Sequence, residues 1–225
     1  MGLSVMKDIS LVIFDMAGTT VRDDNQVPEA FTAALAEHGI AIGARQIQAL
    51  RGASKKQAIV ALLPPGGDLT ARTEAVYETF RAQLAQRFAG TAREVPGAAA
   101  VFAQLRGRGL KVALNTGFDR DTTRMLMGAL GWNEAMVDAI ACGDEVAQGR
   151  PAPDLIHRCM QLTHVGSPDA VANLGDTVLD LRAGHAAGVR LNIGVLSGAH
   201  SRAQLAAEAH THLLASVADL PALLD

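Results

Sequence analysis

Residues 10–20 read SLVIFDMAGTT, an apolar run that ends in a carboxylate and a tight turn. The run does not alternate between apolar and polar positions, which is typical of a strand covered on both faces of a parallel sheet. Asp15 closes the run, and the small residues Ala17 and Gly18 allow the backbone to turn sharply after it. Ligands of open parallel sheets bind outside the carboxyl ends of the strands. The stretch therefore predicts an α/β sheet with Asp15 at its functional edge.

Strands and helices alternate along the rest of the chain. Apolar runs predict four more strands, at residues 111–115, within 135–142, at 170–175 and at 191–196. Helical patterns lie between most of them, at residues 97–108, 120–130, 152–162 and 178–187. This alternation predicts a doubly wound parallel sheet, a Rossmann-like core.

Residues 21–95 interrupt that alternation, because they are too many for one crossover between neighbouring strands. They contain helical patterns at residues 28–38, 54–63 and 69–88, the last with an apolar residue at every fourth position from Val76 to Phe88. Proline and glycine break the pattern at residues 64–67 and 96–97. We expect a core domain at residues 1–20 and 96–225, and an inserted helical cap domain at residues 21–95.

Composition narrows the classes of function. The chain has 225 residues, 49% of them hydrophobic and 19% charged, so it can bury a core and is not disordered as a whole. Its net charge of −3 comes without basic blocks, which argues against nucleic acid and anionic membranes as partners. No apolar run is long enough for a membrane span, and the first 20 residues lack a signal-peptide pattern. Its two cysteines form no disulfide framework. We expect a cytoplasmic protein.

Polar residues follow the other strand ends too. Thr116 and Gly117 come after the second strand, and Asp176 and Asp180 come after the fourth. Arg150 lies between them in the sequence, in a loop braced by prolines. Singly, an Asp before a helix is most often an N-cap and a loop Arg is most often solvated. Together they provide carboxylates for Mg²⁺, a carboxylate nucleophile and donors for phosphoryl oxygens.

In this order the residues resemble the four motifs of the haloacid dehalogenase superfamily, over nearly the whole chain. Two variants bring the resemblance closer to phosphonatase-like hydrolases. Ala17 stands where most members of the superfamily have a second Asp, and Arg150 in Gly149-Arg150-Pro151 stands where most have Lys. The resemblance implies a haloacid dehalogenase core in which the residues 21–95 form the helical cap that closes over the site.

The resemblance also implies a role for each residue. Asp15 is the nucleophile that becomes an aspartyl phosphate. Mg²⁺ is held by Asp15, by the main-chain carbonyl of Ala17 and by Asp176, with Asp180 as a ligand or as support. The residues implied to bind the phosphoryl group are Ala17, Gly18, Thr116, Gly117 and Arg150, of which Thr116 and Arg150 are also implied to be catalytic.

A lysine explains how Ala17 could replace an acid. A phosphate ester releases an alkoxide that needs a proton, whereas a phosphonate leaves through carbon and needs an electron sink. A Schiff base between a lysine and the neighbouring aldehyde supplies that sink. Residues 51–56 read RGASKK and are similar to the segment that carries this lysine in phosphonatases, with Lys55 as the matching residue and Lys56 as the second candidate.

Around the lysine the chain departs from enzymes that act on phosphonoacetaldehyde. Those enzymes have Met, His, Cys and Tyr where this chain has Arg51, Ala58, Asn25 and Phe118. The expected substrate is therefore phosphonoacetaldehyde, a related phosphonate, or a small phosphomonoester if the chain is a phosphatase. A non-catalytic sensor of phosphorylated metabolites is a third reading. A homodimer stays open, because no pattern in the sequence determines the oligomeric state.

Overall fold

The computed structural model describes residues 8–224 and contains a six-stranded parallel sheet with the strand order β3-β2-β1-β4-β5-β6. The strands are β1 (Leu11–Asp15), β2 (Lys111–Asn115), β3 (Ala139–Ala141), β4 (Val171–Gly175), β5 (Leu191–Val195) and β6 (His212–Leu214). The order reverses between β1 and β4, so that β1 lies in the middle and Asp15 ends level with Asn115 of β2. The predicted α/β class and doubly wound sheet are confirmed.

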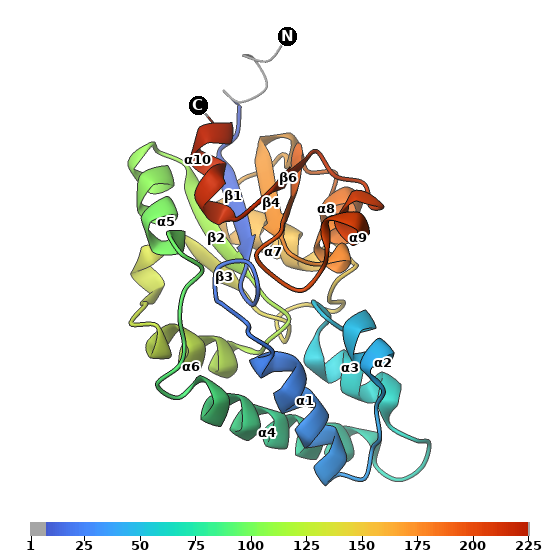
Figure 1. Cartoon of the computed structure of the whole chain (residues 1–225). Helices are drawn as coiled ribbons and strands as arrows, with labels where there is room; N and C mark the ends of the chain where they lie inside the picture. Colours follow the sequence, from blue (N-terminus) through green and yellow to red (C-terminus); the bar gives the residue numbers. More distant parts are fainter. Residues whose placement is uncertain (1–7, 225) are drawn as a thin grey trace.

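Helices cover both faces of the sheet (Figure 1). They are α5 (Ala98–Gly107), α7 (Asp154–Thr163), α8 (Val178–Ala187), α9 (Arg202–Ala206) and α10 (Leu220–Leu223), whereas α6 (Arg120–Ala129) lies beyond the ends of the strands. Alternate residues of β1 face opposite layers: Phe14 packs on Phe102 of α5 with ring centroids 5.2 Å apart, while Ile13 belongs to the cluster that includes Leu155 of α7. Burial on both faces explains why the strands read as unbroken apolar runs.

Between β1 and β2 the chain forms a separate helical layer, the insert, made of α1 (Gln26–Glu37), α2 (Ala44–Ala49), α3 (Lys55–Leu62) and α4 (Leu69–Phe88). Figure 1 shows these helices grouped beyond the end of β1, where the strand delivers Asp15. The apolar stripe of α4 is buried as predicted, and Phe80 meets Phe31 of α1 edge to face at 5.8 Å. Val21 and Glu94 form a β-bridge where the chain enters and leaves the insert. The domain boundaries at 20/21 and 95/96 remain a prediction.

Several short elements were not predicted from the sequence. Helix α2 has no buried residue and so no apolar stripe, and β6 has three residues of intermediate burial at the sheet edge. Within residues 135–142 the strand covers Ala139–Ala141, after a short 3-10 helix at Glu134–Met136. Residues 1–7 and 225, which the predicted core range includes, lie outside the described residues. Over residues 8–224 no helix has the length and hydropathy that crossing a bilayer requires.

Candidate functional site

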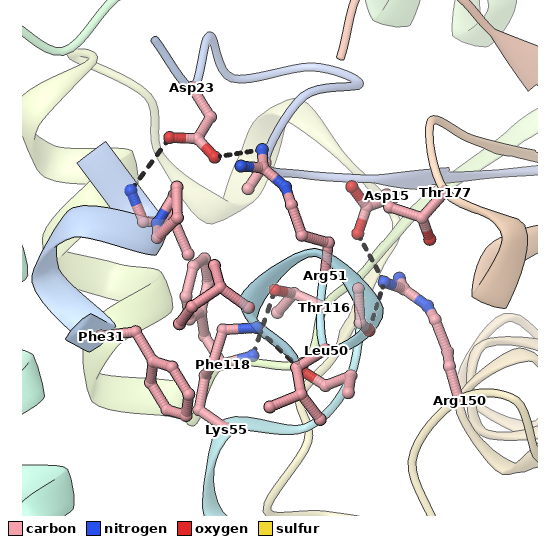
Figure 2. Close-up of a pocket in the computed structure, with 17 residues that line it drawn as sticks. Asp15, Asp23, Phe31, Leu50, Arg51, Lys55, Thr116, Phe118, Arg150 and Thr177 are labelled. Carbon is pink, nitrogen blue, oxygen red and sulfur yellow. Dashed lines mark hydrogen bonds and ion pairs between the residues drawn. The ribbon is translucent and has the colours of Figure 1, made fainter. Parts of the chain in front are cut away.

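The carboxyl ends of the strands and the insert together line one pocket (Figure 2). Asp15 comes from the end of β1, Thr116 from the loop after β2, and Arg150 from the loop before α7. Lys55, at the first turn of α3, comes from the insert. Sheet edge and insert therefore both contribute side chains to the pocket, and these four candidate residues from the sequence lie together in it.

Three buried carboxylates gather at Asp15, which lines the pocket, whereas Asp176 and Asp180 lie outside its lining. Oxygens of Asp15, Asp176 and Asp180 lie within 4.8 Å of one another. Asp176 accepts hydrogen bonds from the Thr19 hydroxyl at 3.2 Å and from the Ala199 backbone N–H at 2.6 Å. Burial and the two neighbouring carboxylates raise the pKa of Asp176 well above its usual range. A cluster of buried oxygens with this excess of negative charge fits a hard divalent cation such as Mg²⁺.

Asp180 is bound on both of its oxygens. One oxygen accepts from the Thr177 hydroxyl at 2.5 Å and from the Thr177 backbone N–H at 3.0 Å, and the latter bond forms a capping box at the start of α8 with the Asp180 N–H, which donates to the Thr177 hydroxyl at 3.3 Å. The other accepts from Arg150 Nε at 2.9 Å. This arrangement favours support of the cluster over direct ligation as the role of Asp180, two alternatives that the sequence left open.

Arg150 is fully engaged with protein acceptors. Its guanidinium contacts Asp15 at 2.7 Å and the main-chain carbonyls of Asn115 at 3.2 Å and Gly52 at 3.3 Å, and it also donates to the Asn115 side chain. Burial raises the pKa of Asp15 to about 6, although Arg150 opposes that rise. In this structure Arg150 orients the nucleophile candidate, which differs from the expected use of its N–H groups on phosphoryl oxygens.

The turn after β1 is packed too closely for any side chain at Gly18. A Cβ there would lie 2.2 Å from a carboxylate oxygen of Asp176, and the residue has a φ of +97°. The Gly18 N–H donates to the Val21 carbonyl at 2.7 Å. The glycine therefore allows the approach of Asp176, while its N–H is engaged within the turn instead of facing a phosphoryl group.

Thr116 and Gly117 bring the core loop against the insert. The Thr116 hydroxyl accepts from the Phe118 N–H at 3.2 Å, which leaves its own proton for another acceptor. The Gly117 carbonyl accepts from the Lys55 N–H at 3.4 Å, and a Cβ at Gly117 would lie 2.6 Å from the Ala53 carbonyl oxygen. Both residues line the pocket, and their binding of phosphoryl oxygens stays a prediction.

Lys55 is a buried amine that faces the pocket (Figure 2). Its Nζ donates to the Ala53 carbonyl at 3.0 Å and lies 5.9 Å from the centroid of the Phe118 ring. Burial, with help from the positive charges of Arg51 and Arg150, lowers the pKa of Lys55 to about 8. A lowered pKa increases the neutral fraction that can act as a nucleophile.

Lys56, the second lysine candidate, has a different environment. Its Nζ is paired with Glu74 at 2.7 and 2.8 Å and lies 5.0 Å from the centroid of the Tyr77 ring. Its side chain is 37% exposed and lies outside the set of residues that line the pocket. The geometry favours Lys55 over Lys56.

One charged pair in the pocket was not predicted from the sequence. Asp23 and Arg51 line the pocket and form an ion pair at 2.7 Å. Burial raises the pKa of Asp23 in spite of hydrogen bonds and the charge of Arg51. Asp23 lies just outside the motifs, and Arg51 stands where phosphonatases have Met, so no local pattern in the sequence joins the two residues.

Comparisons with known proteins identify related sequences and similar folds. A family model for haloacid dehalogenase-like hydrolases matches residues 9–188. A phosphonoacetaldehyde hydrolase of Latilactobacillus sakei is 30% identical over 208 residues, which cover 85% of this chain and 77% of the relative. The crystal structure of a hydrolase from Pseudomonas syringae superposes with a TM-score of 0.84 at 22% identity, covering 95% of this chain and 96% of the other. CbbY of Rhodobacter sphaeroides, crystallised with phosphate, gives 0.81 at 23% identity, covering 96% and 99%.

Proposed function

Because the chain belongs to the haloacid dehalogenase-like hydrolases and is phosphonatase-like, we propose that it is a Mg²⁺-dependent enzyme that cleaves the carbon–phosphorus bond of phosphonoacetaldehyde or a related phosphonate. The observation that carries the proposal is the buried Lys55 amine, which lines one pocket with the Asp15 carboxylate. Such a pair supplies both a nucleophile for phosphorus and an amine for the adjacent carbonyl.

The proposed reaction begins at Lys55. Its neutral Nζ adds to the substrate carbonyl, one proton is taken up from solvent and water leaves, which gives an iminium ion. Asp15 then attacks phosphorus, and the carbon–phosphorus bonding electrons move into the iminium to form an enamine and an aspartyl phosphate. Protonation of the enamine and hydrolysis of the imine release the aldehyde, while water cleaves the acyl phosphate. No acid is needed at residue 17, which is consistent with Ala17 there.

The other residues position these reactants. Arg150 holds the Asp15 carboxylate in place through the contact at 2.7 Å. Thr116 and Gly117 are proposed to bind phosphoryl oxygens through the hydroxyl and the backbone N–H. Asp15, Asp176 and the carbonyl of Ala17 would hold Mg²⁺, with Asp180 in support. When bound, the cation would neutralise charge on the phosphoryl oxygens and on the carboxylates.

A phosphatase acting on a small phosphomonoester is the second candidate. The pKa of Lys55 near 8 favours it in one respect, because an amine with that pKa is still mostly protonated at pH 7. It could donate the proton that a departing alkoxide requires and that Ala17 cannot supply.

Trapping of the imine distinguishes the two reactions. Borohydride added with phosphonoacetaldehyde should leave a reduced covalent adduct on the peptide that contains Lys55. Lys55→Arg should abolish turnover of phosphonoacetaldehyde, because guanidinium stays protonated. The matched control Lys56→Arg should keep most of the activity, since Lys56 is paired with Glu74 outside the pocket.

Three other results would contradict part or all of this proposal. An adduct on Lys56 would support the imine mechanism but contradict the assignment of Lys55 as the reacting lysine. No adduct, together with brisk phosphomonoester hydrolysis that survives Lys55→Arg, would replace the phosphonatase by the phosphatase. No turnover of any phosphonate or phosphate would favour the sensor.

A further inference from the structure

The proposed reaction assigns no role to one charged pair that lines the pocket. Arg51 Nη2 and Asp23 Oδ2 lie 2.7 Å apart, with side chains only 12% and 1% exposed. A buried ion pair contributes little to stability, because the desolvation of both charges offsets their attraction. Stability alone is therefore a weak reason for a guanidinium in the wall of a pocket that is otherwise largely apolar beyond the reacting groups.

The ion pair with Asp23 uses only part of the hydrogen-bond donors of Arg51. Asp23 uses both of its oxygens, since Oδ1 accepts from the Val27 N–H at 2.9 Å and Oδ2 accepts from Arg51. A guanidinium carries five N–H donors. Among residues 8–224, Asp23 is the one acceptor of the Arg51 side chain. Asp23 thus fixes the guanidinium, which Figure 2 shows turned toward it, and further N–H groups remain for a ligand.

The position of Arg51 indicates which part of a ligand it meets. Arg51 and Lys55 belong to the same segment of the insert, whereas Thr116, Gly117 and Arg150 come from the core. If the phosphoryl group lies at Asp15 and the carbonyl at Lys55, as in the proposed function on which this step rests, Arg51 faces the carbonyl-bearing part. A planar guanidinium held on one side suits a carboxylate, which it can bind through two parallel hydrogen bonds.

We propose that Arg51 is a specificity-determining residue that binds a carboxylate on the carbonyl-bearing part of the substrate. The preferred substrates are then carboxylated carbonyl phosphonates, and an uncharged aldehyde such as phosphonoacetaldehyde is a poorer member of the same class. Arg51 takes no part in bond cleavage.

Binding of two isosteric compounds tests this assignment without relying on turnover. 2-Carboxyethylphosphonate and its amide, 2-carbamoylethylphosphonate, carry a carboxylate or a neutral amide one carbon beyond the position of the reacting carbonyl. Calorimetric titration with Mg²⁺ present should give a Kd at least about tenfold lower for 2-carboxyethylphosphonate. Arg51→Gln should remove that preference, and the matched variant Lys55→Gln should keep it, because Lys55 is assigned to the carbonyl and not to the carboxylate.

A double variant guards against misfolding. Arg51→Gln leaves Asp23 as a buried unpaired carboxylate, so the Asp23→Asn/Arg51→Gln protein, in which both charges are gone, is titrated in parallel and its fold checked by circular dichroism. Equal affinities in the wild type, a preference that persists in both Arg51 variants, or a preference that disappears with Lys55→Gln would each overturn the proposal. These outcomes do not depend on imine trapping, so a failed phosphonatase assignment and a failed carboxylate subsite are told apart.

Discussion

Lys55 is the residue whose protonation state should govern the proposed reaction. Its pKa is lowered to about 8 by burial and by Arg51 and Arg150, and only the neutral amine can add to a carbonyl. We predict that kcat/KM for phosphonoacetaldehyde rises about tenfold per pH unit below pH 8 and levels off above it. Steady-state kinetics from pH 6 to 9.5 measures this profile. A flat profile would contradict imine formation at this lysine.

The same shift has a consequence for stability that needs no substrate. Because the folded-state pKa of Lys55 is lowered from 10.5 to about 8, the unfolded chain binds more protons between these values, and stability rises with pH there. The cost of the buried ammonium is complete below pH 8. Lys55→Met should therefore raise the free energy of unfolding at pH 7 by up to about 3 kcal/mol, and the gain should disappear by about pH 10.5. Urea denaturation at the two pH values provides the comparison.

The place of a single residue in the site could be predicted where the neighbouring sequence indicates its role. Asp15 at the end of an apolar run is such a residue, whereas Lys55 is indicated by the resemblance of residues 51–56 to the lysine-bearing segment of phosphonatases; both lie in the pocket. The Asp23–Arg51 pair was not, because its partners are 28 positions apart and meet only through the packing of the insert. The engagement of Arg150 with Asn115 and Gly52 was hidden for the same reason.

Among the elements, the loop between α2 and α3 joins the insert to the core. Gly52 in this loop has a φ of +82°, and a Cβ there would lie 2.4 Å from the Thr177 hydroxyl. Gly90 has a φ of +68° with nothing within 4 Å of its Cβ position, so it is a matched control for the backbone strain alone. We predict that Gly52→Ala lowers kcat/KM at least about tenfold, because the loop can no longer approach Thr177. Gly90→Ala should change kcat/KM less than twofold.

Kinetics and unfolding measured together separate the two effects. Both variants place alanine at a positive φ and should lose about 1 kcal/mol of stability each. Equal activities of Gly52→Ala and Gly90→Ala would mean that contact between this loop and Thr177 does not matter for catalysis.

Elements were predictable in proportion to their apolar pattern. The α4 helix, with its stripe from Val76 to Phe88, has the expected bounds, as does β2. Helix α2 buries no residue, and β6 is a three-residue strand at the sheet edge. Burial produces the periodicity from which elements are predicted, so elements that bury little leave no trace in the sequence.

At the scale of the whole molecule, the sheet order decides what meets at its edge. Because β1 lies between β2 and β4, the loops after all three strands converge on Asp15, and the insert supplies the opposite wall of the pocket. The alternation of strands and helices predicted this convergence. The contacts between insert and core, such as the Gln48 amide with the Ala199 carbonyl at 3.2 Å, depend on how the two layers fit and have no signature in the sequence.

The convergence also concentrates negative charge, and this gives a prediction for the stability of the whole protein. Asp15, Asp176 and Asp180 are buried within 4.8 Å of one another. The pKa of Asp176 is raised and that of Asp15 rises from 3.8 to about 6, so the folded state holds protons that the unfolded state releases. Without a divalent cation, stability is therefore lost as pH rises from about 4 through these folded-state values. A cation bound by the folded cluster alone restores it, by about 2.7 kcal/mol at a hundredfold excess over Kd.

We predict that Mg²⁺ raises the thermal unfolding temperature relative to EDTA, and more at pH 8 than at pH 5, because protons compete with the cation for the same oxygens. Asp176→Asn should remove the Mg²⁺ effect by removing a charged ligand. Asp144→Asn is the matched control. Asp144 is exposed and belongs, with Cys142 and Glu145, to the other group of residues that could hold a metal ion. Scanning calorimetry of the three proteins with and without Mg²⁺ measures the shifts. An equal Mg²⁺ effect in Asp176→Asn and the wild type would place the cation elsewhere. The repulsion among the three buried carboxylates would then not be offset by a cation bound between them.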